Sequence, residues 1–161
     1  MSFWLINTVN FHIMIQPNIQ LNFLAIGLAV VASFMVGFLW YSFLFGKAWQ
    51  KEMGYSDKME VDKKMMVKSL VLNIIGTFLM VWVFSHNIAA WDPKTWRVDK
   101  SFMPPVGAAL SSAIFTWLGF YVPQDLNKVS FHMRSWKLFF IDTSYNLVSL
   151  LVAAFILVLM K

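Results

Sequence analysis

Asp142 is the residue with the clearest chemical potential, because it is the one acidic residue of eight that the sequence predicts inside an apolar span. It follows Lys137 by five residues, or roughly 7 Å along a helix. A carboxylate at that depth is costly unless it pairs with a partner or takes up a proton. One hypothesis is therefore a proton- or cation-linked group. The alternative is structural: a tie to Asn73 or Lys68, or a position in the hydrated head groups.

Other polar residues recur at helical spacing around this position. Asp142, Asn146 and Ser149 share one helix face with Ala153. A similar face on an earlier helix carries Asn73. We therefore expect a polar intramembrane site in one half of the membrane, built from helices one, two and four. Its predicted members are Asp142, Asn146, Asn73, Tyr145, Tyr41, Trp40 and Lys68.

The sequence contains no motif of a known catalytic centre. It has no cysteine, and its three histidines show no spacing typical of a metal site. His86 is interpreted as an interfacial polar tip, with titration near neutral pH as the alternative. No nucleophile elbow, phosphate loop or zinc helix motif is present. We expect no enzymatic activity, no cofactor and no metal.

Composition predicts a membrane protein. The 161 residues are 59% hydrophobic and 13% charged, whereas soluble domains have about 25% charged residues. The mean hydropathy is +0.63. Residues 21–45 lack any charge and, as a helix, reach roughly 37 Å, more than the bilayer core of about 30 Å. The net charge of +5 lies mainly beside apolar segments, which indicates contact with lipid head groups and not with nucleic acid.

The predicted fold is all-α: a polytopic membrane protein with four transmembrane helices in a bundle. Residues 1–161 form a single membrane domain. Gly54 is predicted to stop an extension of the first helix, Asp57 to cap the second, and the pair Pro104-Pro105 to begin the third. An apolar N-terminal segment, residues 1–20, is too short to span, and we expect it to lie at the interface or pack on the bundle, with a loosely ordered terminus as the alternative. The expected helices cover about 21–45, 66–88, 105–122 and 137–160.

Small residues repeat every fourth position in the first helix. They are Ala25, Ala29, Ser33 and Gly37. Such a face lets a second helix approach closely within lipid. It serves packing either within the chain or between chains, and the sequence leaves both possibilities open.

The distribution of basic residues predicts the orientation. Four spans put both termini on one side. The loops after the first and third helices hold nine of the 13 basic residues. By the positive-inside rule these loops are cytoplasmic and both termini lie outside the cytoplasm.

Two aromatic motifs resemble a known family. Gly37-Phe38-Leu39-Trp40-Tyr41-Ser42, with Phe45-Gly46-Lys47-Ala48-Trp49, is similar to the opening signature of domain of unknown function 1761. The segment Phe131 to Val152, with Trp136 to Asp142 and Tyr145, resembles the family's C-terminal half, and Trp117-Leu118-Gly119-Phe120 fits between them. The resemblance covers most of residues 21–160 and excludes the N-terminal segment. It implies a four-helix protein of the bacterial inner membrane and carries no activity.

Two functional hypotheses follow. The first is a small transport or channel-like protein with a polar intramembrane face. The second is a non-catalytic accessory or scaffold subunit that binds lipid or another membrane protein. A lipid-directed enzyme ranks last, because only Asp142, His86 and hydroxyl groups could supply a nucleophile or base. Four helices are too few to enclose a wide pathway, so we expect a homo-oligomer in the lipid bilayer.

Overall fold

The computed structural model describes residues 18–55, 62–97 and 104–160, and within these ranges the regular structure is entirely helical. Four segments are long and apolar enough to cross a membrane: Phe23–Leu44, Lys63–Ala90, Pro105–His132 and Trp136–Leu159. The protein is therefore an all-α polytopic membrane protein. Its elements in order are α1 (Phe23–Leu39), a π-helical turn (Trp40–Leu44), α2 (Gly46–Glu52), α3 (Lys63–Ala90), a 3₁₀ turn (Pro93–Trp96), α4 (Pro105–Thr116), a second π-helical turn (Trp117–Tyr121), α5 (Val122–His132) and α6 (Trp136–Leu159).

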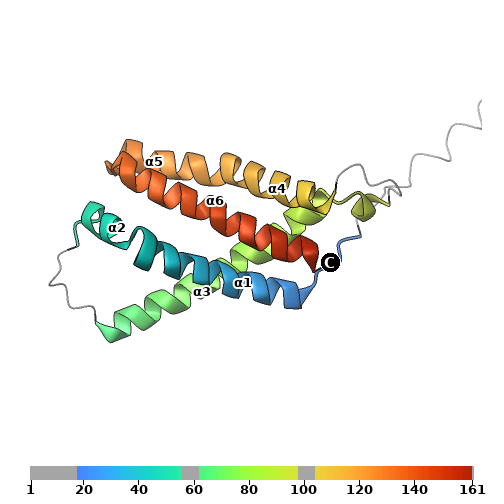
Figure 1. The fold of residues 1–161 in the computed structure, drawn as a ribbon, viewed down its shortest axis with the longest axis horizontal. Helices are drawn as coiled ribbons and strands as arrows, with labels where there is room; N and C mark the ends of the chain where they lie inside the picture. The colour runs from blue at the N-terminus through green and yellow to red at the C-terminus, as the bar shows by residue number, and fades with distance from the viewer. Residues whose placement is uncertain (1–17, 56–61, 98–103, 161) are drawn as a thin grey trace, which may run out of the picture.

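The two ends of the described chain lie at the same end of the bundle (Figure 1). The Asn22 side chain caps α1 by accepting from Leu24 N and Ala25 N at 3.0 and 3.1 Å. Its amide nitrogen also donates to the Met160 carbonyl at the end of α6, at 2.7 Å. We name this the terminal end. The opposite end, where α2, α5 and the start of α6 meet, carries most of the described basic residues, and we name it the basic end.

The core lies where α6 crosses α1, α3 and α4. The small residues Ala25, Ala29 and Ser33 of α1 are fully buried, and α1 packs chiefly against α6 and α3. This face of α1 therefore packs within the chain. Gly37 lies further along the same face, where an added Cβ would stand 3.1 Å from the Tyr145 hydroxyl.

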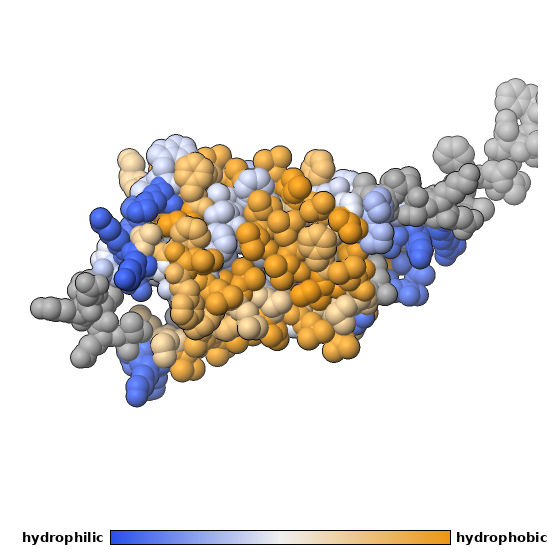
Figure 2. Space-filling view, in the orientation of Figure 1, coloured by the Kyte–Doolittle hydropathy of each residue, from blue (hydrophilic) through white to orange (hydrophobic). Residues whose placement is uncertain are grey.

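Helix α3 joins this core through its C-terminal half only. Val81, Phe84 and Ile88 are buried. Residues 62–76, in contrast, are exposed on every face, and in Figure 1 this part of α3 diverges from α1 and α6. On the face shown in Figure 2, an apolar band lies between hydrophilic residues at the two ends. The exposed apolar side chains of this band face the bilayer.

The third span differs from its prediction. The sequence predicted that the third helix ends at about residue 122, directly before Pro123, and a proline normally ends a helix. Instead α5 continues to His132, after the second π-helical turn. The Pro123 ring would clash with the carbonyl four residues earlier in a regular helix, and the wider π-helical turn just before it relieves this conflict.

Other predicted signals lie close to the observed helix ends. Gly54 stands just beyond α2 with φ +73°, a conformation that glycine adopts without strain. Pro105 is the first residue of α4. Helix α3 begins after Asp62, whose side chain accepts from Lys64 N at 3.1 Å. The predicted cap at Asp57 and most of the N-terminal segment lie outside the described residues.

Candidate functional site

Asp142 lies on α6, near the basic end, where it faces the first π-helical turn. The hydroxyl of Tyr41 donates to Asp142 Oδ1 at 2.9 Å. The second oxygen, Oδ2, has no hydrogen-bond partner among the described residues. Asp142 is half-buried. The carboxylate therefore has one fixed contact and one oxygen that remains available.

Two tryptophans hold the backbone on either side of Asp142. Trp40 Nε1 donates to the Ile141 carbonyl at 3.1 Å, and Trp117 Nε1 donates to the Thr143 carbonyl at 2.7 Å. Each tryptophan is the first residue of a π-helical turn, and its own carbonyl accepts from the residue five positions later. The two π-helical turns thus hydrogen-bond to the backbone of α6 on both sides of Asp142, and these bonds fix the position of its side chain. Such bulges are frequent at functional sites.

Aromatic rings form the wall beside Tyr41. Its ring contacts Tyr145 edge-on with centroids 5.0 Å apart, and Trp49 of α2 at 5.5 Å. The absence of a side chain at Gly37 makes room for Tyr145, because a Cβ there would stand 3.1 Å from the Tyr145 hydroxyl, closer than an ordinary van der Waals contact. The predicted residues Trp40, Tyr41, Tyr145 and Asp142 are therefore brought together.

Asp125 is a site residue that the sequence analysis missed. Placed by prediction in a loop, it is instead 2% exposed within α5. Lys128 Nζ lies 2.8 Å from its Oδ1, and Asn146 Nδ2 donates to its Oδ2 at 3.1 Å. Asn146 thus binds Asp125 across the interface of α5 and α6. A signal was present: a proline followed by an acidic residue is typical of a helix's first turn, which Pro123 and Asp125 provide for α5.

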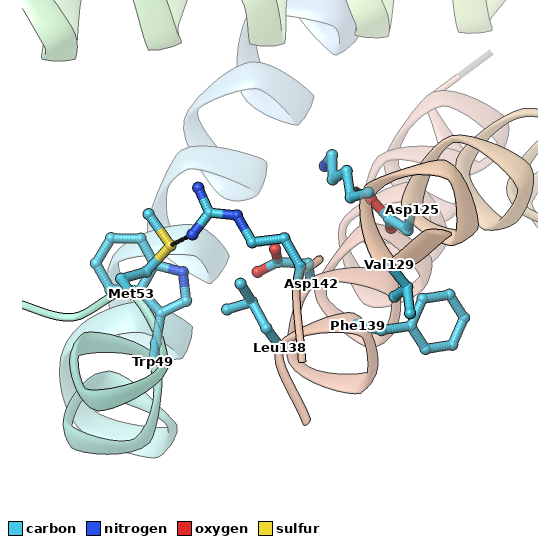
Figure 3. A pocket seen from close by; sticks show the side chains of 9 residues that line it. Trp49, Met53, Asp125, Val129, Leu138, Phe139 and Asp142 are labelled. Carbon is cyan, nitrogen blue, oxygen red and sulfur yellow. Dashed lines mark hydrogen bonds and ion pairs between the residues drawn. The ribbon is translucent and has the colours of Figure 1, made fainter. Parts of the chain in front are cut away.

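A pocket of about 210 Å³ opens between α2, α5 and the start of α6. Figure 3 shows Trp49 and Met53 of α2 on one side and Asp125 and Val129 of α5 on the other, with Asp142 between them. Its lining residues are Trp49, Met53, Asp125, Lys128, Val129, Arg134, Leu138, Phe139 and Asp142. The pocket therefore combines two carboxylates with two cations at the basic end.

The turn between α5 and α6 places Arg134 over the pocket. Met133 adopts a left-handed conformation with φ 54°, and Arg134 N donates to the Lys128 carbonyl at 3.2 Å. Arg134 Nη1 contacts the sulfur of Met53 at 3.3 Å. No carboxylate of the described residues lies within ion-pair distance of its guanidinium.

Glu52 attaches α2 to this turn. A hydrogen bond from Ser135 and the ammonium of Lys137, 3.6 Å away, hold the pKa of Glu52 below its ordinary value. Glu52 thus stays ionised and keeps the α2 wall of the pocket, which carries Trp49 and Met53, next to the start of α6.

Two predicted members do not join Asp142. The proposed ties from Asp142 to Asn73 or Lys68 are wrong, since Asp142 bonds Tyr41 instead. Lys68 is exposed on the diverging part of α3. Asn73 lines a separate open groove of about 300 Å³ between α3 and α6, together with Tyr121, Tyr145 and Asn146. The pocket around Asp142 therefore has walls from α2, α5 and α6, and none from α3.

Within the described ranges, no group of three histidine, aspartate or glutamate side chains could hold a metal ion. His86 lies on α3 with Nδ1 2.9 Å from the carbonyl of Trp82, one turn earlier. The chemistry available at the pocket is therefore ion pairing, hydrogen bonding and proton exchange at carboxylates.

Comparison with protein families gives a match to a family model. Searches of curated proteins and of solved structures found none. The family described as "Protein of unknown function (DUF1761)" matches residues 24–158. This range contains all four spans almost entirely, both π-helical turns and the whole Asp142 pocket, and the chain is therefore a member of the DUF1761 family.

Proposed function

We propose that the protein is a small carrier of polar solutes, in which binding is linked to a proton or cation at Asp142. The observation that supports this most strongly is the pair of intramembrane carboxylates, Asp142 and Asp125, in one pocket. Ionisable residues inside spans are costly and commonly belong to ion or substrate pathways. Asp125 is neutralised by Lys128, whereas Asp142 has a neutral phenol as its hydrogen-bond partner.

Access from one end favours a carrier over a channel. The pocket opens at the basic end, while the half of the bundle beyond it is filled by fully buried side chains such as Ala29, Ala113 and Ala153. A continuous pore would need a hydrated path through that packed region. A carrier exposes its site to one side at a time, and this arrangement suits one of its two states.

We further propose the bacterial inner membrane as the location, with both termini outside the cytoplasm. The basic end carries Lys47, Lys51, Lys128, Arg134 and Lys137, among others. By the positive-inside rule this end faces the cytoplasm. The Asp142 pocket then opens to the cytoplasm.

Proton entry into proteoliposomes tests the proposed function. Vesicles of phosphatidylethanolamine and phosphatidylglycerol enclose a pH-sensitive dye, and a potassium gradient with valinomycin sets the potential. We expect the protein to raise proton entry above that of protein-free vesicles, and Asp142→Asn to remove the increase, because an amide neither ionises nor exchanges the proton. Asp92→Asn makes the same chemical change at the terminal end and should keep the wild-type rate.

Either of two outcomes would overturn this proposal. The wild-type protein would show no more proton entry than empty vesicles, or Asp142→Asn would retain the full rate. The variant's folding is checked by circular dichroism in the same vesicles, so that a lost rate is assigned to the carboxylate.

A second candidate, an accessory subunit without transport, is favoured by the diverging half of α3. Residues 62–76 are all exposed, and Asn73 is among them. A polar side chain inside a bilayer is better satisfied against another helix than against lipid. A second copy of the chain or another membrane protein would supply that helix. Cross-linking from Asn73→Cys, in a chain that has no other cysteine, distinguishes a homo-oligomer from a hetero-complex by the mass of the product.

A further inference from the structure

The Asp142 pocket is lined by one positive and one negative side chain that do not pair with each other. Lys128 pairs with Asp125 at 2.8 Å, which leaves Arg134 and Asp142 as the two charges in the lining that form no salt bridge with any residue the structure describes. No ion pair joins Arg134 to Asp142 among the described residues, although both line the same 210 Å³ space. A bound molecule that carries both charges would satisfy both groups at once.

Arg134 supplies the anion-binding side. A guanidinium presents five N–H donors in a planar fork that matches phosphate oxygens. The described contact of Arg134 is with Met53 Sδ, and a thioether is a weak acceptor. Lys128, whose side chain is 44% exposed, stands on the same lining and adds a second positive charge. An oxyanion would replace the sulfur contact with stronger hydrogen bonds.

Asp142 supplies the cation-binding side. Its Oδ1 accepts from Tyr41, and its Oδ2 is left to accept from a ligand. Trp49 lines the same pocket, and an indole face attracts an ammonium group. A primary ammonium would donate to Asp142 Oδ2 beside this ring. A quaternary ammonium has no N–H to donate.

We propose that the pocket binds a zwitterion with a primary ammonium and a phosphate a few bonds apart, which is the chemistry of a phosphoethanolamine group. The phosphate contacts Arg134 and Lys128, and the ammonium contacts Asp142. Asp142 is six residues into α6, roughly 9 Å from the helix start, close to the depth of lipid head groups. This inference rests on the proposed function, since it names the class of solute for the same site.

Equilibrium binding tests the inference without requiring transport. Native mass spectrometry of the full chain in detergent is carried out with added phosphatidylethanolamine, phosphatidylcholine or phosphatidylglycerol. We expect phosphatidylethanolamine to bind at least tenfold more tightly than the other two, because only it offers both a phosphate and a primary ammonium. Soluble phosphoethanolamine, added in competition, identifies the source: displacement at comparable concentration indicates a free solute, and lipid binding without displacement indicates a head group held with its acyl chains.

Substitutions test which pocket residue binds the ammonium and which binds the phosphate. Asp142→Asn and Arg134→Gln should each weaken phosphatidylethanolamine binding about tenfold, whereas Arg97→Gln, the matched change at the terminal end, should leave it unchanged. Arg134 is exposed, so its replacement leaves the core intact. Equal binding of all three lipids, or unchanged binding in Arg134→Gln, would overturn the inference.

The two proposals fail separately. Selective binding without proton entry would retain the ligand class and reject the carrier. Proton entry that depends on Asp142, with no selective binding, would retain the carrier and reject the ligand class.

Discussion

Replacement of Asp125 by alanine is expected to lower the free energy of unfolding by about 2 kcal/mol, because it leaves the half-buried amide of Asn146 without its acceptor. The lost contacts are Asn146 Nδ2 to Asp125 Oδ2 at 3.1 Å and Lys128 Nζ to Asp125 Oδ1 at 2.8 Å. The ammonium of Lys128 is partly exposed and can return to water, so most of the cost comes from the amide. Unfolding by SDS in mixed micelles measures the change.

Two matched variants separate the contributions at Asp125. Asp125→Asn keeps an acceptor oxygen for Asn146, and Lys128→Gln removes only the partly exposed charge. Each is expected to cost less than about 1 kcal/mol. If Asp125→Ala proved no more destabilising than Lys128→Gln, the buried hydrogen bond across α5 and α6 would not hold these helices together.

Replacement of Gly46 by alanine is expected to cost about 2 kcal/mol and to displace Tyr41 from Asp142. A Cβ at Gly46 would stand 2.7 Å from the Tyr41 carbonyl oxygen, closer than real contacts allow. The obstacle is backbone, so the π-helical turn itself must shift, and overpacking of this kind typically costs about 1–3 kcal/mol. The same micelle assay measures stability, and loss of phosphatidylethanolamine binding reports the displaced site.

Gly76→Ala is the control for Gly46. Nothing lies within 4 Å of a Cβ at Gly76, which is in the exposed part of α3. Alanine favours a helix over glycine by up to about 1 kcal/mol, so this variant should be neutral or slightly stabilised. Equal behaviour of the two variants would show that α2 does not depend on close approach to the first π-helical turn.

The spans were predictable because length and hydropathy suffice for them. A helix needs about 20 residues to cross a bilayer, and the four spanning helices have 22, 28, 28 and 24 residues. The small residues Ala25, Ala29 and Ser33 were also recognisable, since their spacing places them on one face. Whether that face meets its own chain or another required the structure, in which α6 covers it.

The path of the third span was not predictable from Pro123. A proline normally ends a helix, and only the preceding π-helical turn lets α5 continue. Asp125 was therefore assigned to a loop and left out of the site. The predicted placement of Asn73 beside Asp142 was wrong for a different reason. In lipid, an apolar helix surface is stable against another helix and against acyl chains alike. Helical periodicity therefore does not reveal that the N-terminal half of α3 diverges from the bundle.

The most direct test of these proposals measures from which side of the membrane a reagent reaches the Asp142 pocket. The chain has no cysteine, so Val129→Cys introduces a single thiol in the pocket lining. A membrane-impermeant maleimide is applied to oriented vesicles from either side, with Lys94→Cys as the marker for the terminal end. We expect Val129→Cys to react only from the side opposite to Lys94→Cys. Reaction of both cysteines from the same side, or none of Val129→Cys from either, would contradict these proposals.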